Sequence, residues 1–246
     1  MRRFFVNPED ITNEKVYIKD DDAHHLSQVL RLKEGEQIIV FAGTGVEYLV
    51  EINDISTGLV IGDILGVTSS QRDSHVNVTL VQGIPKGDKM DLIVQKCTEV
   101  GIARIIPVLT ERTVVKLDKD KQKKRQDRWQ KIAQEASKQC QRATVPQIED
   151  ICTWPQYFAK NDLLGPTLVL WENESSYGLK AFLKENTELE HITLVIGPEG
   201  GLSRQEVKQL LARGASTVTL GPRILRTETA GLAALIMVLY ELGDLG

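Results

Sequence analysis

Apolar positions along the chain follow two different patterns, and the change falls near residue 75. Up to about residue 72, short apolar runs are separated by turn-forming segments such as EGE, GTG and STG, which is typical of a small all-β module. One helical pattern lies within residues 20–34, with Asp22 as its candidate N-cap. The expected strands span residues 4–6, 15–18, 37–41, 46–52 and 59–65.

From residue 75 onward, continuously apolar runs alternate with helical patterns. This alternation predicts an α/β domain whose parallel sheet is covered by helices on both faces. We therefore expect two domains, residues 1–72 and 73–246, joined by the polar segment 68–74. The expected strands span residues 76–82, 104–109, 167–172, 192–197 and 216–221, and the expected helices span residues 88–100, 123–142, 179–185, 203–213 and a last segment that ends near residue 242.

Glycine-rich turns follow two of the predicted strands. GPEGG, residues 197–201, and LGPRILRTETA, residues 220–230, each lead from a strand into a helix. Parallel strands end at the same edge of a sheet, where open α/β folds bind small ligands, and helix starts there offer unpaired amides. A third strand end, LWE at residues 170–172, is expected beside them. The sequence predicts a ligand pocket here, although tight turns without a ligand remain the plain alternative.

Other chemistry-bearing residues narrow the function. Neither GxxxxGK[ST] nor GxGxxG after a first strand is present, so neither a P-loop enzyme nor an ordinary dinucleotide-binding fold is indicated. The three cysteines lack CxxC spacing and the four histidines lack metal-ligand spacing, which predicts no metal site and fits a reducing cytoplasm. No secretory signal is expected at residues 1–10, and the longest apolar run, residues 230–240, is too short for a membrane span.

Charge is unevenly distributed along the chain. The net charge is −4, but residues 112–142 contain 11 Lys and Arg against 4 Asp and Glu, a local charge of +7. Such a segment can bind phosphates in a salt-dependent manner, although a solvated helix face is the usual meaning of a charge run. The basic residues expected on one face of the helix are Arg128, Lys131, Lys138 and Arg142.

Several motifs together resemble the SPOUT superfamily of knotted methyltransferases. The two glycine turns, LWE upstream and QGIPKGDKMDLIVQKCTEVGI at residues 82–102 are similar to the ribosomal RNA small-subunit methyltransferase E family. That family methylates N3 of a uridine in 16S rRNA. The N-terminal module, with RRFFV and HHLSQVLR, resembles the family's PUA-like RNA-binding β-barrel. The resemblance covers the whole chain.

The resemblance implies a deep trefoil knot, a homodimer and an S-adenosyl-L-methionine site. It assigns the cofactor-binding residues to two groups. One group lies on the loops at residues 170–172 and 196–201, and the other lies on the loop at residues 220–230. The first group consists of Leu170, Glu172, Ile196, Gly197, Glu199, Gly200 and Gly201. The second group consists of Leu220, Ile224, Leu225, Arg226, Thr229 and Ala230.

The reaction itself suggests catalytic residues. Uridine N3 carries a proton at neutral pH, so its methylation requires a base or a cation that stabilises the uridine anion. Arg226 is a candidate for that stabilisation, and Glu228 or Glu199 is a candidate proton acceptor. The target base must be unpaired or flipped out, which requires RNA contacts elsewhere. Besides the basic helix, the candidates are Arg3, His24, Arg31, Lys86, Lys89 and Arg112, and the partner is 16S rRNA or the small ribosomal subunit.

Three other readings stay open on residue grounds. A pure RNA-binding module would use the glycine turns only structurally. An anion-binding hydrolase would use GPEGG for a nucleotide phosphate, but no hydroxyl or metal-binding carboxylate pair stands beside it. A related methyltransferase would modify a 2′-hydroxyl or a different base, and only the family resemblance selects uridine N3.

Overall fold

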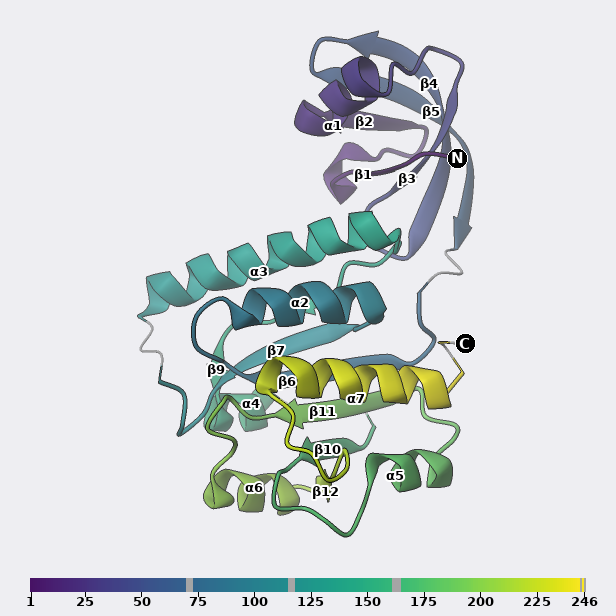
Figure 1. Ribbon diagram of the computed structural model, residues 1–246. Coiled ribbons are helices and arrows are strands. Elements are labelled where there is room, and N and C mark those ends of the chain that lie inside the picture. The colour runs from purple at the N-terminus through teal and green to yellow at the C-terminus, as the bar shows by residue number, and fades with distance from the viewer. Residues whose placement is uncertain (70–72, 115–117, 161–164, 244, 246) are drawn as a thin grey trace. The chain divides into compact units, whose positions relative to one another are not determined.

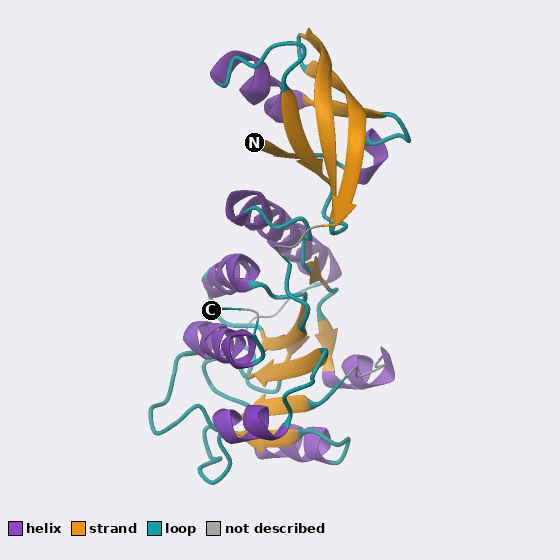
Figure 2. Cartoon of the chain, turned by 90° about the vertical axis from the view of Figure 1, so that its right-hand side faces the viewer, coloured by secondary structure: helices purple, strands orange, loops and turns teal. Residues whose placement is uncertain are grey.

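The structure is a computed structural model of the 246-residue chain. It describes residues 1–69, 73–114, 118–160, 165–243 and 245, so part of the expected linker and Lys116 of the basic segment lie outside the described residues. The chain forms two compact units (Figures 1 and 2). Unit 1 consists of residues 1–73 and 137–145, and unit 2 consists of residues 74–136 and 146–246.

Unit 1 is built on a five-stranded sheet in the order β1-β3-β4-β5-β2. β1 pairs with β3 in parallel, and the remaining neighbours pair antiparallel. Its buried core includes Val16, Ile38, Val50 and Ile52. The elements are β1 (Arg3–Phe5), a 3-10 turn (Pro8–Asp10), β2 (Lys15–Lys19), α1 (Asp20–His24), a π-helical turn (His25–Val29), β3 (Gln37–Phe41), β4 (Val46–Ser56) and β5 (Leu59–Ser69).

Two details of unit 1 differ from the sequence expectation. β1 and β2 lie at opposite edges of the sheet, so among the described residues the strands form an open sheet and not a fully closed β-barrel. The helix begins at Asp20 with Lys19 at the N-cap position, so Asp22 lies inside the first turn and does not cap it. Acidic side chains in a first turn still complement the positive end of the helix dipole.

Unit 2 is an α/β unit that begins with β6. Its elements alternate between strands and helices as the apolar pattern predicts. They are β6 (Asn77–Gly83), α2 (Lys89–Val100), β7 (Arg104–Leu109), α3 (Lys119–Cys140), β8 (Gln147–Ile148), β9 (Cys152–Thr153), α4 (Trp154–Lys160), β10 (Thr167–Leu170), α5 (Leu179–Glu185), β11 (His191–Ile196), α6 (Arg204–Leu211), β12 (Ser216–Val218) and α7 (Thr227–Glu241).

The sheet of unit 2 is parallel throughout, in the order β12-β10-β11-β6-β7-β8, with β9 also paired to β7. The strand order does not follow the chain order. β12, the last strand, lies at one edge beside β10, so the carboxyl ends of β10, β11 and β12 are neighbours. This neighbourhood brings the three predicted loops together.

Helices cover both faces of this sheet (Figures 1 and 2). α2 and α7 pack against each other on one face, where α7 contacts β6 and β11. On the other face, Trp154 and Tyr157 of α4 and Val207 and Leu210 of α6 join one buried cluster with strand residues such as Val195. Because helices cover both faces, side chains that point to either face are mostly buried and apolar, which explains the nearly continuous apolar runs.

The start of α6 follows the local sequence, whereas the end of α3 differs from the expectation. Ser203 and Glu206 form the predicted capping box at the start of α6, which satisfies two otherwise unpaired amides. α3 ends at Cys140, two residues before the expected end, and residues 137–145 belong to unit 1. The expected boundary at residue 72 assigned all of this segment to the second domain.

Candidate functional site

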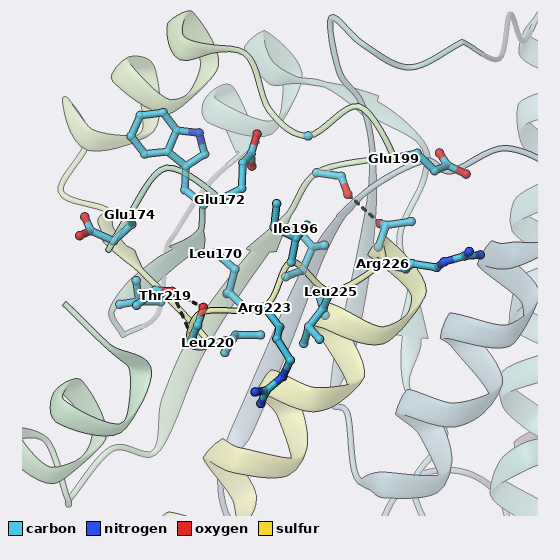
Figure 3. Close-up of a pocket in the computed structure, with 18 of the residues that line it drawn as sticks. Leu170, Glu172, Glu174, Ile196, Glu199, Thr219, Leu220, Arg223, Leu225 and Arg226 are labelled. Atoms are coloured by element: carbon cyan, nitrogen blue, oxygen red, sulfur yellow. Dashed lines mark hydrogen bonds between the residues drawn. The ribbon is translucent and has the colours of Figure 1, made fainter. Parts of the chain in front are cut away.

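A cavity of about 880 Å³ opens at the carboxyl ends of β10, β11 and β12. This volume lies within the roughly 300–1,000 Å³ common for small-molecule sites. Three loops form its wall, at residues 170–175, 196–201 and 218–227, and Lys89 of α2 contributes from the side. Figure 3 shows that these loops face one another across the cavity.

The first loop is held in shape by Glu174. One carboxylate oxygen accepts hydrogen bonds from the amide and hydroxyl groups of Ser176 (2.8 and 2.6 Å), and the other accepts from the Thr217 hydroxyl (2.7 Å). These hydrogen bonds, those from Ser176 and Thr217 above all, lower the pKa of Glu174 to about 2. Glu174 is therefore a structural anion in the cavity wall, unsuited to accept a proton.

The second loop requires glycine at two places. Gly201 has φ +70°, and a Cβ there would lie 2.6 Å from the Glu172 carboxylate; a Cβ on Gly197 would lie 2.7 Å from the Gly201 carbonyl carbon. Both distances are shorter than real Cβ contacts. The glycines thus allow the loop to fold tightly on itself and leave bare main chain facing the cavity.

The third loop runs from Thr219 to the start of α7. The Thr219 hydroxyl interacts with both the amide and the carbonyl of Gly221 at 3.2 Å. Ile224 is 86% exposed and the Arg226 side chain is 82% exposed. An apolar side chain left in water at the mouth of a cavity is available to cover an apolar ligand such as a purine ring.

A buried hydrogen-bond network connects the second and third loops. The Thr227 hydroxyl donates to the Gly197 carbonyl (2.7 Å), and Gln82 Nε2 donates to Thr227 Oγ1 (2.9 Å) and to the Gly83 carbonyl (2.9 Å). Gln82 is fully buried at the end of β6. Buried polar groups of this kind fix loop geometry because leaving any one of them unpaired is costly.

Four charged residues gather beside the cavity. Lys89 Nζ lies 2.8 Å from Glu199 Oε1 and 3.7 Å from Glu228 Oε2, and Arg226 lies 4.0 Å from Glu228 Oε1. The Lys86 amide also donates to Glu199, at 3.1 Å. Figure 3 places Glu199 and Arg226 on the same side of the cavity, away from Glu172 and Glu174.

These contacts shift two pKa values in opposite directions. The hydrogen bond to Glu199 raises the pKa of Lys89 above its usual value of 10.5. Partial burial acts to raise the pKa of Glu199, but the hydrogen bonds from Lys89 and from the backbone outweigh it and lower that pKa. Lys89 is therefore a cation and Glu199 an anion at neutral pH.

The structure brings together nearly all the residues that the resemblance assigns to the cofactor. Those on the first two strand ends all line the cavity, and so do those on the third loop except Thr229. Thr229 is exposed on α7 and lies outside the wall, so its assignment to the cofactor stays a prediction. Glu228 also lies outside the wall, with an Oε2 atom that is buried and has no hydrogen-bond partner.

Sequence reasoning missed several wall residues. Lys89 was expected only as an RNA contact. Glu174 had no motif of its own, although it follows a predicted strand end, which was a usable signal. Thr219 was expected inside the strand 216–221, but β12 ends at Val218. Ser175 and Val218 lie outside the segments predicted to form the pocket. Six further wall residues lie inside those segments but were not assigned to the cofactor: Trp171, Pro198, Gly221, Pro222, Arg223 and Thr227.

Two arginines expected to bind RNA are internal to unit 1. Arg3 makes a bidentate ion pair with Glu47, at 2.8 and 2.7 Å, and its side chain is 10% exposed. Arg142 is 6% exposed, lies beyond the end of α3, and its Nε is 3.2 Å from Asp73 Oδ1. Buried, paired guanidinium groups are structural, so neither arginine is available to a phosphate; this corrects both assignments.

The remaining candidates of unit 1 are more accessible. Lys138 is half-buried, lies 3.3 Å from Asp22 and packs over the Phe5 ring. His24 and Arg31 are exposed. His24 and Arg31 thus keep the accessibility that an RNA contact requires, whereas Lys138 is partly occupied.

The candidates of unit 2 differ in the same way. Lys86 and Lys131 are exposed. Arg128 is exposed but pairs with Asp91 of α2, and Arg112 Nη1 donates to the Gly200 carbonyl at 2.5 Å. Arg112 therefore braces the second loop of the cavity and has a structural role whether or not it touches RNA.

The part of the chain that the structure describes lacks two other kinds of feature. It holds no group of three or more His, Cys, Asp or Glu residues placed to bind a metal ion. Among the same residues, no helix is both long and apolar enough to cross a membrane. The cysteines Cys97, Cys140 and Cys152 are free thiols, and burial raises the pKa of Cys97 to about 12.

Known proteins are similar to this chain in sequence and in architecture. The RNA methyltransferase domain family matches residues 72–239, and the RNA methyltransferase PUA domain family matches residues 18–65. The chain is 36% identical to ribosomal RNA small subunit methyltransferase E of Bacillus subtilis over 251 residues, which cover 98% of this chain and 97% of the relative. The chain belongs to the ribosomal RNA small subunit methyltransferase E family.

Other members of the methyltransferase E family agree with this. The protein of that name from Synechocystis is 34% identical and covers 96% of this chain and 76% of its own length. A crystal structure of ribosomal RNA small subunit methyltransferase E from Neisseria gonorrhoeae, bound to S-adenosyl methionine, superposes with a TM-score of 0.85 at 33% identity over 100% of both chains. The fold is thus that of an RNA methyltransferase with an N-terminal PUA domain.

Proposed function

We propose that this chain transfers a methyl group from S-adenosyl-L-methionine to N3 of a specific uridine in 16S rRNA, with the assembled small ribosomal subunit as its substrate. The observation that carries the proposal is the cavity at the three strand ends, in a chain of the methyltransferase E family. The cofactor is supported by the Neisseria relative, whose structure has S-adenosyl methionine bound. Uridine N3 is supported by the sequence resemblance alone.

The residues of the cavity fit the cofactor. The second loop presents bare main chain where a Cβ would clash with its own neighbours, and backbone amides there can hold the polar part of a ligand. Leu170, Ile196, Leu220, Ile224 and Leu225 offer apolar contacts for the adenine ring. Glu172, Gly197, Glu199, Gly200, Gly201, Arg226 and Ala230 complete the proposed binding set.

The sulfonium of the cofactor supplies an already activated methyl group, so the protein must align the acceptor and manage a proton. Arg226 is free to approach O2 or O4 of the base and stabilise the charge that develops there. Glu199 is held by two hydrogen-bond donors and has a lowered pKa, which makes it a weak base. Glu228 pairs with Lys89 and Arg226 and lies outside the cavity wall, so we propose that it accepts the proton through a water molecule.

The base must leave its helix before N3 can react, so binding relies on contacts away from the cavity. The accessible basic residues Arg31, Lys86 and Lys131, together with His24, are the candidates that the structure leaves exposed. An assembled subunit presents such contacts in a fixed arrangement. We infer that binding weakens steeply with salt, as phosphate contacts require.

The proposal extends to the topology and assembly of the chain. A deep trefoil knot is supported by the sequence resemblance alone. A homodimer is supported by the exposed apolar side chains of α7, Ile236, Met237 and Tyr240. We place the enzyme in the cytoplasm, where ribosomal subunits are assembled.

The test is transfer of a tritiated methyl group from S-adenosyl-L-methionine to small subunits and to free 16S rRNA from a strain without the enzyme. We expect 3-methyluridine by mass spectrometry, formed faster on the subunit. Faster reaction of free rRNA would refute the subunit as substrate, and a different methylated nucleoside would refute N3. RNA binding without cofactor binding would instead favour a pure RNA-binding protein.

A further inference from the structure

Lys89 is a cation at the start of helix α2, where the helix itself does not favour a positive charge. It is the first residue of α2, where the positive end of the helix dipole disfavours a cation. The side chain is 34% exposed and lines the cavity. Two carboxylates from other elements, Glu199 of the second loop and Glu228 of α7, offset the unfavourable placement at 2.8 and 3.7 Å. The fold therefore holds an ammonium group in the wall of the cavity.

Glu199 is the residue that fixes this ammonium group. Its carboxylate accepts from Lys89 Nζ at 2.8 Å and from the Lys86 amide at 3.1 and 3.3 Å. One carboxylate thus binds both ends of the turn that precedes α2. An ammonium group has three N–H donors, and within the described residues Lys89 uses one of them in a hydrogen bond. The others can reach a ligand.

We propose that Lys89 is a further catalytic residue of the methyl transfer, whose ammonium group donates to O2 or O4 of the target uridine and stabilises the anion from which N3 reacts, with Glu199 as its positioning residue. The inference rests on the proposed function. Arg226 and Lys89 then flank the base with two positive charges, one on the third loop and one on α2. Glu228, which lies between them, is the third member of this cluster.

The N3–H bond of uridine breaks, and its electron pair stays on the base and spreads over N3, O2 and O4. The proton passes through a water molecule to the Glu228 carboxylate, which lies behind the cavity wall. N3 then uses that pair to form the N3–CH₃ bond, while the electrons of the broken C–S bond stay on the sulfur of the departing thioether. Lys89 gives up no proton, because the hydrogen bond to Glu199 raises its pKa and keeps it cationic.

Lys86 offers a matched control. It lies three residues before Lys89, carries the same charge and is exposed, but its side chain does not line the cavity, and Glu199 uses only its amide. Lys86→Met and Lys89→Met remove the same charge from the same turn. If both lysines only attract RNA phosphates, the two variants behave alike.

The experiment measures single-turnover methyl transfer to small subunits across pH, together with cofactor affinity and with RNA affinity in the absence of cofactor. We expect Lys89→Met to lower the rate at saturation about 100-fold, the range seen when one preorganised donor to a developing oxyanion is removed. The pH at which the rate levels off should rise, because the uridine anion loses a stabilising charge. Cofactor affinity should stay within about 2-fold, an expected outcome for a group that acts on the base.

Two more variants keep the result interpretable. Lys89→Arg retains the charge and should recover part of the rate. Adding Glu199→Gln to Lys89→Met should cost little more rate than Lys89→Met alone, because a positioning residue acts through the group that it positions. Lys86→Met should weaken RNA affinity and should lower the rate at saturation far less than Lys89→Met does.

Three results would overturn the inference. The first is a loss of cofactor affinity in Lys89→Met that accounts for the whole loss of rate. The second is equal behaviour of Lys86→Met and Lys89→Met. The third is a rate–pH profile that is the same in Lys89→Met as in the wild type. The wild-type enzyme must form 3-methyluridine in the same assay. If it does not, the proposed function fails, whereas failure of the inference appears only in the variants.

Discussion

At the scale of single residues, the hydroxyl group of Thr227 connects two cavity loops. It donates to the Gly197 carbonyl of the second loop while it accepts from Gln82 at the end of β6. Thr227 is also the first residue of α7, so the helix start, the third loop and the second loop share one buried polar contact. Loss of this hydroxyl group should therefore change the geometry of the cavity and weaken the proposed binding of the cofactor.

Thr227→Val keeps the shape of the side chain but removes this hydroxyl. We expect a loss of about 1–3 kcal/mol in the free energy of unfolding, since two buried polar groups lose their partner, and a weaker affinity for S-adenosyl-L-methionine. Thr229→Val, on the same helix but exposed and outside the cavity wall, should change neither by much. Calorimetric titration and denaturant unfolding measure both. Equal losses in the two variants would place Thr229 in the cofactor site.

Gly201 is the residue at which a single methyl group should close the site. Its φ of +70° is strained for other residues, and a Cβ would come within 2.6 Å of the Glu172 carboxylate. That flexible side chain, which lines the cavity, would have to move away from its position. Gly201→Ala should cost on the order of 1–3 kcal/mol of stability and at least about 10-fold in cofactor affinity, for which a shift of 1.4 kcal/mol suffices. Gly214→Ala, at φ +88° with open space at the end of α6, should lose stability but not affinity. Similar affinities for both variants would show that the second loop does not contact the cofactor.

At the scale of elements, the loop after β10 depends on one carboxylate. Glu174 accepts from Ser176, Tyr177 and Thr217, so it ties this loop both to itself and to β12. These hydrogen bonds require the ionised form, which links the order of the loop to pH.

The direction of that pH effect follows from the lowered pKa. The folded value is about 2 against an ordinary 4.5, so the stabilisation is fully present above about pH 4.5 and is lost as the pH falls toward 2. Glu174→Gln should make unfolding less dependent on pH in this window, as followed by denaturant midpoints. Glu188→Gln, at an exposed site before β11, is the control. An unchanged pH dependence in Glu174→Gln would contradict the account.

The elements themselves were largely predictable, and their exceptions have physical causes. Continuous apolar runs gave the longer strands of the parallel sheet, and the capping box gave the start of α6. The two-residue strands β8 and β9 were missed because so short a pairing leaves no periodic pattern. α4 was missed because its 7 residues are too few to show a repeating helical pattern.

The sequence predicted where the cavity lies, but it did not predict the contacts between the charged side chains beside it. Glycine turns after predicted strands located the cavity. The Lys89–Glu199 ion pair joins residues 110 positions apart, and it forms only because β6 lies beside β11. Arg142 was misassigned because helical spacing was extended past Cys140, where the chain leaves the helix. Spacing predicts a shared face only while the helix lasts.

At the scale of the whole molecule, the exposed face of α7 is the candidate interface of the proposed homodimer. Leu235, Val238 and Leu239 are buried, but Ile236, Met237 and Tyr240 are exposed. Apolar side chains gathered on one helix face indicate an interface. Met237→Glu should convert the proposed dimer to a monomer in sedimentation and lower activity in parallel. Lys184→Glu, a charge change on the exposed surface of α5, should leave the dimer intact. A fully active Met237→Glu monomer would contradict an assembly-dependent site.

The central claim is that the cavity of unit 2 holds the cofactor for methylation of uridine N3. Its most direct test is mass spectrometry of 16S rRNA nucleosides from a strain without the enzyme, complemented with wild type, Gly201→Ala or Gly214→Ala. The account predicts 3-methyluridine with wild type and Gly214→Ala and its loss with a folded Gly201→Ala protein. Full methylation by Gly201→Ala, or no 3-methyluridine with wild type, would contradict it.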